Sequence, residues 1–140
     1  MEGDSLAPPC QSDDDIIEKI VEIANLNSTS YLFDLGCGDG RICREASKKY
    51  GCKSCGVEIE PTLAEAFKEK TKEMNLESLV HVVAGDLCDV DISAATVIVL
   101  YLLPEAIELI REKLVAALQG GAVLICHTWG PKGLTPVNRI

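Results

Sequence analysis

Three glycines and three acidic residues are the part of this sequence whose types and spacing could do chemistry. Gly36, Gly38 and Gly40 recur at every second position after a short apolar segment, so the backbone there can approach a ligand where a Cβ atom would collide. Asp34 stands two positions before the first glycine and adds a carboxylate that suits a positively charged amino group. The stretch therefore predicts a binding loop for a small molecule with a cationic part.

Two further carboxylates, Glu58 and Asp86, each end an apolar segment. An acid about 20 residues after a glycine loop can accept hydrogen bonds from both hydroxyls of a ribose, which is the role that we expect for Glu58. The alternative is a solvated charge before a helix, for which Glu60 is an equal candidate. Asp86 could accept a hydrogen bond from the exocyclic amine of adenine beside an apolar Leu87, or its carboxylate could bind nearby backbone in a turn.

Alternating apolar segments and amphipathic patterns place these residues along one edge of a sheet. We expect strands at 31–35, 54–59, 79–84, 94–102 and 122–127, and helices at about 12–25, 40–50, 61–75 and 104–118. Strands that alternate with helices predict an α/β fold, in which helices cover both faces of a parallel sheet. Ligands of such sheets bind beyond the carboxyl ends of the strands, where Asp34, Glu58, Asp86 and Tyr101 fall.

Length and charge limit the classes of partner. The 140 residues suffice for one domain, with 1–11 as a flexible tail and 12–140 as the folded part. A net charge of −9 would repel a phosphate backbone, so we expect no nucleic-acid partner. No segment approaches the roughly 20 apolar residues that cross a bilayer, so no membrane partner is expected either.

Cysteine usage indicates the compartment. The chain has seven cysteines, an odd number, and several fall in predicted strands or helices. We therefore expect free, mostly buried thiols and a cytoplasmic protein. Cys52 and Cys55 have a spacing found in metal sites, but no second pair or histidine ligand accompanies them, so no metal is expected.

The motifs resemble, in order, three motifs of class I S-adenosylmethionine-dependent methyltransferases. They are Asp34-Leu-Gly-Cys-Gly-Asp-Gly40, Gly56-Val-Glu-Ile-Glu-Pro61 and Gly85-Asp86-Leu87. The run from Thr96 to Pro104 is also similar to the fourth strand of a small-protein branch that includes protein-lysine methyltransferases. The resemblance implies a Rossmann-like fold and S-adenosylmethionine as cofactor, with S-adenosylhomocysteine as product. It also implies methyl transfer to a small-molecule or protein acceptor, of which a protein lysine is one candidate.

The resemblance further implies the site residues. Asp34 would lie near the methionine amino group, the glycine loop beneath the cofactor, Glu58 at the ribose and Asp86 at adenine. The cofactor-binding set is then Asp34, Gly36, Cys37, Gly38, Glu58, Ile59, Asp86 and Leu87. Tyr101 could line the methyl-transfer pocket as the catalytic candidate, or it could be a half-buried strand residue.

A nicotinamide-binding fold is the rival interpretation. It expects glycines spaced Gly-x-Gly-x-x-Gly, with a pyrophosphate at the helix N-terminus. The spacing here is Gly-x-Gly-x-Gly, and Asp39 would place a negative charge where the pyrophosphate lies. The methyltransferase interpretation is therefore preferred.

The carboxyl-terminal part departs from the family. Class I methyltransferases have seven strands, and residues 128–140 are too few for the last two strands with their connection. We therefore expect the fifth strand to form an exposed edge, where a partner chain or a second copy could bind. The alternative function is then a non-catalytic module that binds S-adenosylmethionine or another protein.

Overall fold

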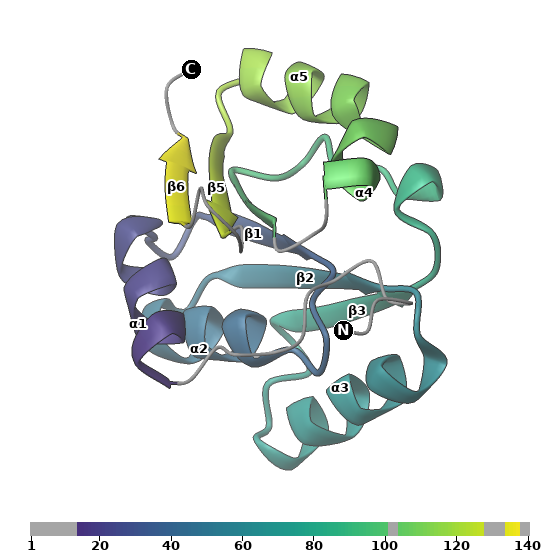
Figure 1. Ribbon diagram of the computed structural model, residues 1–140. Helices are drawn as coiled ribbons and strands as arrows, with labels where there is room; N and C mark the ends of the chain where they lie inside the picture. The colour runs from purple at the N-terminus through teal and green to yellow at the C-terminus, as the bar shows by residue number, and fades with distance from the viewer. Residues whose placement is uncertain (1–13, 101–103, 128–133, 138–140) are drawn as a thin grey trace.

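A six-stranded sheet forms the centre of the protein in the computed structural model, which describes residues 14–100, 104–127 and 134–137. The strands are β1 (Tyr31–Leu35), β2 (Lys53–Glu58), β3 (Val80–Ala84), β4 (Val97–Leu100), β5 (Val123–His127) and β6 (Leu134–Val137). Their order is β3-β2-β1-β4-β5-β6; β1 to β5 are parallel, and β6 is antiparallel to β5 (Figure 1). The predicted α/β class is confirmed.

Helices cover both faces of the sheet (Figure 1). One face carries α1 (Asp14–Ile23), α2 (Arg41–Tyr50) and α3 (Pro61–Glu73), and the other carries α4 (Pro104–Leu109) and α5 (Arg111–Gln119). A short 3-10 helix, η1 (Leu87–Asp89), lies between β3 and β4. The single helix predicted for 104–118 is wrong, because Ile110 leaves helical geometry (φ −113°, ψ 17°) and divides it. None of the helices described is long and apolar enough to span a bilayer.

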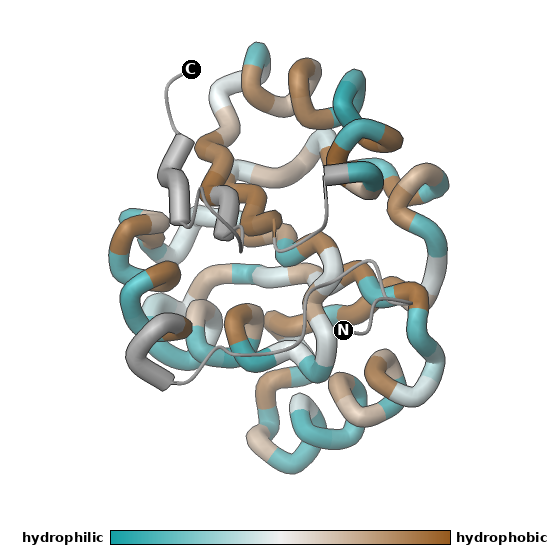
Figure 2. The backbone as a smooth tube through the Cα atoms, in the orientation of Figure 1, coloured by the Kyte–Doolittle hydropathy of each residue, from teal (hydrophilic) through white to brown (hydrophobic). Residues whose placement is uncertain are grey.

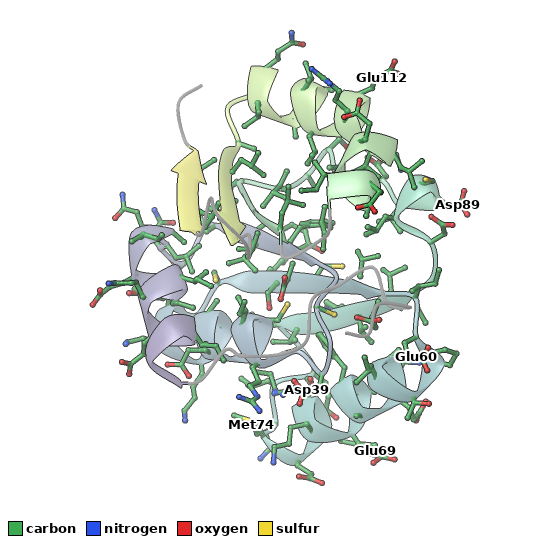
Figure 3. The ribbon with its side chains drawn as sticks, viewed as in Figure 1. Asp39, Glu60, Glu69, Met74, Asp89 and Glu112 are labelled. Carbon is green, nitrogen blue, oxygen red and sulfur yellow. The ribbon has the colours of Figure 1, made fainter. Side chains whose placement is uncertain are left out.

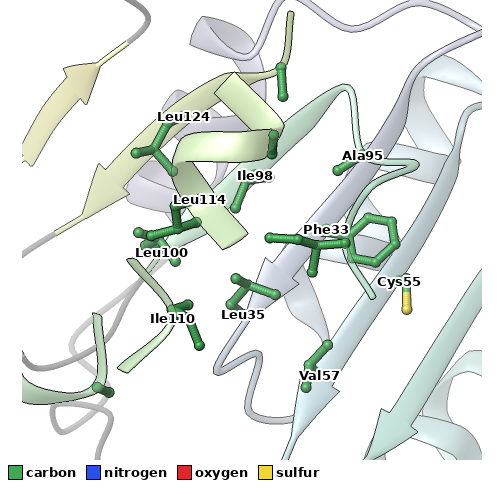
Figure 4. Packing of buried hydrophobic residues seen from close by; sticks show 14 residues of the cluster. Phe33, Leu35, Cys55, Val57, Ala95, Ile98, Leu100, Ile110, Leu114 and Leu124 are labelled. Atoms are coloured by element: carbon green, nitrogen blue, oxygen red, sulfur yellow. The ribbon is translucent and has the colours of Figure 1, made fainter. Parts of the chain in front are cut away.

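Apolar side chains fill the space on both sides of the strands. Figure 4 shows the cluster under α4 and α5, where Leu35 of β1 lies near Ile110 and Phe33 of the same strand lies near Ala95. The opposite cluster includes Leu32 of β1 and residues of α1, α2 and α3. Strands β1 and β4 are buried on both faces, as near-continuous apolar sequences in a parallel sheet require, and Figure 2 shows the resulting hydrophobic centre.

The fifth strand is not an exposed edge, which corrects the sequence prediction. Strand β6 pairs with it, Leu124 opposite Val137 and His127 opposite Leu134. One antiparallel neighbour needs only a short connection, whereas the prediction had required room for two strands. Pro136 weakened the signal of a strand in the sequence, but a residue without a backbone N–H is tolerated at a sheet edge. The expected partner contact at β5 therefore loses its basis.

A buried aromatic ring joins α3 to the sheet and to the glycine-rich turn. Phe67 is only 1% exposed, and a Cβ atom added to Gly56 of β2 would lie 2.6 Å from its ring and 2.6 Å from Cys37 Sγ. A Cβ atom on Gly40 would lie 2.4 Å from the same ring. Glycine at these two positions therefore makes room for Phe67, not for a ligand.

Gly56→Ala should destabilise the protein by roughly 1–3 kcal/mol, because the new methyl group overpacks a filled site. Urea denaturation measures the loss. Gly85→Ala is the matched control, since a Cβ atom there would meet nothing within 4 Å. It should change the free energy of unfolding by less than about 0.5 kcal/mol. Equal stability of the two variants would contradict the packing role of Gly56.

Candidate functional site

The turn after β1 is built on the end of β2. The backbone N–H groups of Gly36 and Cys37 both donate to the Val57 carbonyl, at 2.9 and 3.2 Å. Gly38 has a φ of +60°, and an added Cβ atom there would meet nothing within 4 Å. Gly38 therefore leaves open space above the backbone. Its φ lies in the left-handed region, where residues with a side chain are disfavoured.

Asp34 lies on β1 immediately before this turn, where it pairs with Gly56 on one side and Val99 on the other. Its side chain is 2% exposed, and among the described residues its Oδ1 atom has no hydrogen-bond partner. Burial, with a smaller effect from the Glu58 carboxylate, raises the pKa of Asp34 from 3.8 to about 7. A buried carboxyl group with an unused acceptor suits a ligand that brings N–H donors or a positive charge.

Glu58 is the residue that connects the glycine turn to the neighbouring strands. Its Oε1 atom accepts the Gly38 N–H at 2.8 Å, and its Oε2 atom accepts the Glu60 N–H at 3.0 Å. Its side chain is buried at 8% exposure, whereas Glu60 is exposed. The structure therefore excludes the solvated charge that the sequence left open as an alternative for Glu58. Each carboxylate oxygen keeps a further lone pair for a ligand.

The third motif begins at the same sheet edge. The Gly85 N–H donates to the Glu58 carbonyl at 3.0 Å, so β3 ends beside the end of β2. Asp86 is exposed, and its Oδ1 atom accepts the Cys88 N–H at 2.8 Å, which caps η1. This is the turn that the sequence left open as an alternative, and it leaves the second carboxylate oxygen outside the cap. Leu87 packs in part against the core below α4 and α5.

Apolar groups flank the carboxylates. Ile59, directly after Glu58, is 58% exposed, and Leu63 on the first turn of α3 is 39% exposed.

Cys37 is partly buried, and burial raises the pKa of its thiol, so it stays protonated and is a poor nucleophile. Tyr101, the catalytic candidate from the sequence, lies outside the described residues, as does the 1–11 tail.

Sequence reasoning missed a buried cation behind the turn. Arg44 of α2 is 5% exposed, and its Nη1 donates to the Asp39 carbonyl at 2.6 Å, with its guanidinium 5.8 Å from the Phe67 ring centre. The Asp39 carboxylate lies 3.9 Å from both Arg41 Nε and Arg44 Nη2. Figure 3 shows Asp39 close to the beginning of α2. An arginine in a polar helical sequence is expected at the surface, so nothing in the sequence indicated that Arg44 is buried.

The described residues hold no cluster of three or more histidine, cysteine or acidic side chains able to bind a metal ion. Cys52 and Cys55 are each buried and free, and their thiols contact the Ala46 and Gly56 carbonyls at 3.7 and 3.9 Å. The pair serves packing near β2.

The arrangement combines a buried acid, an open glycine and two acidic strand ends at the carboxyl edge of a parallel sheet. The strand order reverses between β1 and β4, which is where ligands of such sheets bind. The unpartnered Asp34 oxygen and the open space over Gly38 fit a ligand with a cationic amino group. These are features of a class I S-adenosylmethionine-dependent methyltransferase site.

Comparison with known proteins agrees with this class. A family profile described as "ANTKMT methyltransferase domain" matches residues 34–138. A protein-lysine N-methyltransferase of Saccharolobus islandicus is 31% identical over 126 residues, which are 89% of this chain and 78% of that protein. A carboxy-S-adenosyl-L-methionine synthase of Vibrio parahaemolyticus is 33% identical over 69% of this chain, which spans 42% of that protein.

A solved structure is also similar. The RNA methyltransferase of Salinibacter ruber, in complex with S-adenosyl-L-homocysteine, has a TM-score of 0.77 and 32% identity, covering 87% of this chain and 83% of that one. The chain belongs to the ANTKMT methyltransferase domain family and is an S-adenosylmethionine-dependent methyltransferase.

Asp34→Asn should stabilise the ligand-free protein at pH 8 more than at pH 5. Because folding raises the pKa of Asp34 from 3.8 to about 7, folding favours its neutral form. The contribution of Asp34 to stability is therefore highest below pH 4 and falls as the pH rises toward 7. The amide cannot ionise, so at pH 8 the variant should gain roughly 2–4 kcal/mol over the wild type.

Urea titrations at both pH values test this prediction. Glu69→Gln, on the exposed face of α3 (Figure 3), is the control for loss of a surface charge and should show no such pH-dependent difference. A stability difference between Asp34→Asn and wild type that does not change with pH would contradict a neutral Asp34.

Proposed function

We propose that this methyltransferase binds its cofactor on the glycine turn between Asp34, Glu58 and Asp86, and transfers the methyl group to a protein lysine. The observation that carries the proposal is the buried Asp34 carboxyl group, whose Oδ1 atom has no partner among the described residues. A group of this kind is expensive to bury unless a ligand satisfies it. Burial and, to a smaller extent, the Glu58 carboxylate raise the pKa of Asp34, and this carboxylate binds the N–H of the open Gly38.

Each motif then has a part of the cofactor to bind. Asp34 accepts from the amino group of the methionine moiety, directly or through water. The turn of Gly36, Cys37 and Gly38 packs beneath the cofactor. Glu58 Oε1 lies 2.8 Å from the Gly38 nitrogen, and each carboxylate oxygen keeps a further lone pair that can accept a ribose hydroxyl.

The base-binding end consists of Asp86 and its neighbours. One Asp86 oxygen caps η1, and the other is assigned to the exocyclic amine of adenine. Leu87 and the exposed Ile59 supply apolar surface for the base and the ribose.

When bound, S-adenosylmethionine supplies an electrophilic methyl group on a positively charged sulfur. The protein contributes position: the hydrogen bonds around Glu58 hold three strand ends in fixed relation, and oriented binding of this kind lowers a transfer barrier substantially. The acceptor nitrogen must be neutral to attack, and its proton passes to water or to a nearby base.

A lysine acceptor is supported by two observations. The relative from Saccharolobus islandicus, matched over 78% of its length, is a protein-lysine N-methyltransferase. The chain carries 22 acidic and 13 basic residues, so it attracts basic protein segments and repels nucleic-acid phosphates. The RNA methyltransferase of similar structure makes RNA the acceptor to test against lysine.

The cytoplasm is the compartment that we propose. Five cysteines in the described residues are free, and four of them are wholly or partly buried. Unpaired thiols are typical of a reducing environment.

Glu58→Gln should weaken binding of S-adenosylhomocysteine by about tenfold to a hundredfold, because the amide loses the charge and one acceptor for the ribose. Isothermal titration calorimetry measures the affinity, and Glu60→Gln, two positions away and exposed, should bind like the wild type. The loss of affinity caused by Glu58→Gln should be smaller for an analogue of S-adenosylhomocysteine that lacks the ribose 2′-hydroxyl. Equal losses for both ligands, or none, would rule out the ribose contact.

Labelled methyl transfer from S-adenosylmethionine identifies the acceptor class. The substrates are a basic peptide with a single lysine, the same peptide with arginine in its place, and a structured RNA. Label should enter only the lysine peptide, and Glu58→Gln should reduce the rate at limiting cofactor. Label in the RNA, or in neither lysine peptide nor RNA while S-adenosylhomocysteine binds, would refute the lysine assignment.

A further inference from the structure

One lysine of α5 binds the turn that carries Asp86. Lys113 Nζ donates to the carbonyl oxygens of Leu87, Cys88 and Val90, at 3.1, 2.7 and 2.5 Å. An ammonium group has three N–H donors, so these contacts use all of them. The lysine is only partly exposed, and it lies on α5 between the buried Ile110 and Leu114.

The three carbonyl groups belong to η1 and the residue that follows it. The Leu87 carbonyl also accepts the Val90 N–H at 3.3 Å, and a cation is favourable near the carbonyl groups that end a helical turn. The opposite end is capped by Asp86, whose Oδ1 accepts the Cys88 N–H. The turn is therefore held at both ends by side chains, one of which is the residue assigned to adenine.

Packing supports this segment only in part. A cleft of about 390 Å³ lies between residues 89–95 and α5, and the α5 side is lined by Lys113 and the small residues Ala116, Ala117 and Gly120. Figure 3 shows Asp89 on the turn and Glu112, the neighbour of Lys113, on α5. Leu87 and Val90 pack in part against the core below α5, and the three hydrogen bonds of Lys113 add a direct polar connection between the turn and the helix.

We propose that Lys113 is a positioning residue for base recognition: it holds the turn from Asp86 to Val90 so that the free oxygen of Asp86 faces the exocyclic amine of adenine. The inference rests on the proposed function, because it takes the assignment of Asp86 from there. Lys113 itself touches neither cofactor nor acceptor. Its effect is on the choice of base.

The test compares two ligands by calorimetry, S-adenosylhomocysteine and S-inosylhomocysteine, in which an oxygen replaces the exocyclic amine. Wild type should prefer the adenine ligand. Lys113→Met should lower that preference by about tenfold, with kcat at saturating cofactor unchanged. Arg111→Met is the matched control, since Arg111 forms an exposed ion pair with Glu108 at 3.2 Å, and it should keep the wild-type preference.

Asp86→Asn distinguishes the adenine contact of Asp86 from the positioning role of Lys113. The asparagine oxygen can still cap η1, while the amide nitrogen cannot accept a hydrogen bond from the adenine amine. An unchanged preference in Asp86→Asn would refute the assignment of Asp86 and with it the proposed binding mode. A reduced preference in Asp86→Asn but not in Lys113→Met, or equal losses for both ligands in Lys113→Met, would refute only the role of Lys113. If Lys113→Met does not fold, Lys113→Gln, which removes the charge, serves in its place with the same expectations.

Discussion

The carboxylate of Glu58 is the contact on which the site depends. It accepts the Gly38 N–H with one oxygen and the Glu60 N–H with the other, and its own carbonyl accepts the Gly85 N–H. One residue thereby joins the turn after β1, the start of α3 and the end of β3. Since the bonds to the Glu58 carboxylate are partly buried, losing this acceptor would leave backbone donors unpaired where water has limited access, which is costly.

Side-chain packing under the glycine turn supports this arrangement. It also explains residues of the turn whose role the motif alone does not reveal. Phe67 fills the space beside Gly40 and Gly56, and Arg44 lies against its ring while binding the Asp39 carbonyl. The glycine turn is thus supported from below by an aromatic ring and a buried cation. Over Gly38 the turn is open, and this is the side on which we propose that the cofactor binds.

Much of the fold and site followed from local patterns. The apolar run before Gly36 and the alternation of strands and helices were enough to predict a parallel sheet, and Asp34, Glu58 and Asp86 were expected at its carboxyl edge because side chains at strand ends share one edge. Strand β6 was not predicted, because its four residues include a proline and because the strand with which it pairs, β5, had been assigned as an edge. The break between α4 and α5 at Ile110 was not predicted, because the apolar pattern of the sequence continues at helical spacing across it.

By itself, the sequence determined the class of ligand, since glycine spacing and acidic strand ends are properties of residue type and order. Tertiary structure decided which glycines make room for Phe67, which one leaves open space, and whether Glu58 is solvated or buried. It also brought Lys113 to a turn more than twenty residues earlier in the chain. The reason is physical: backbone preferences act over a few residues, whereas burial and long-range hydrogen bonds exist only once distant segments pack together.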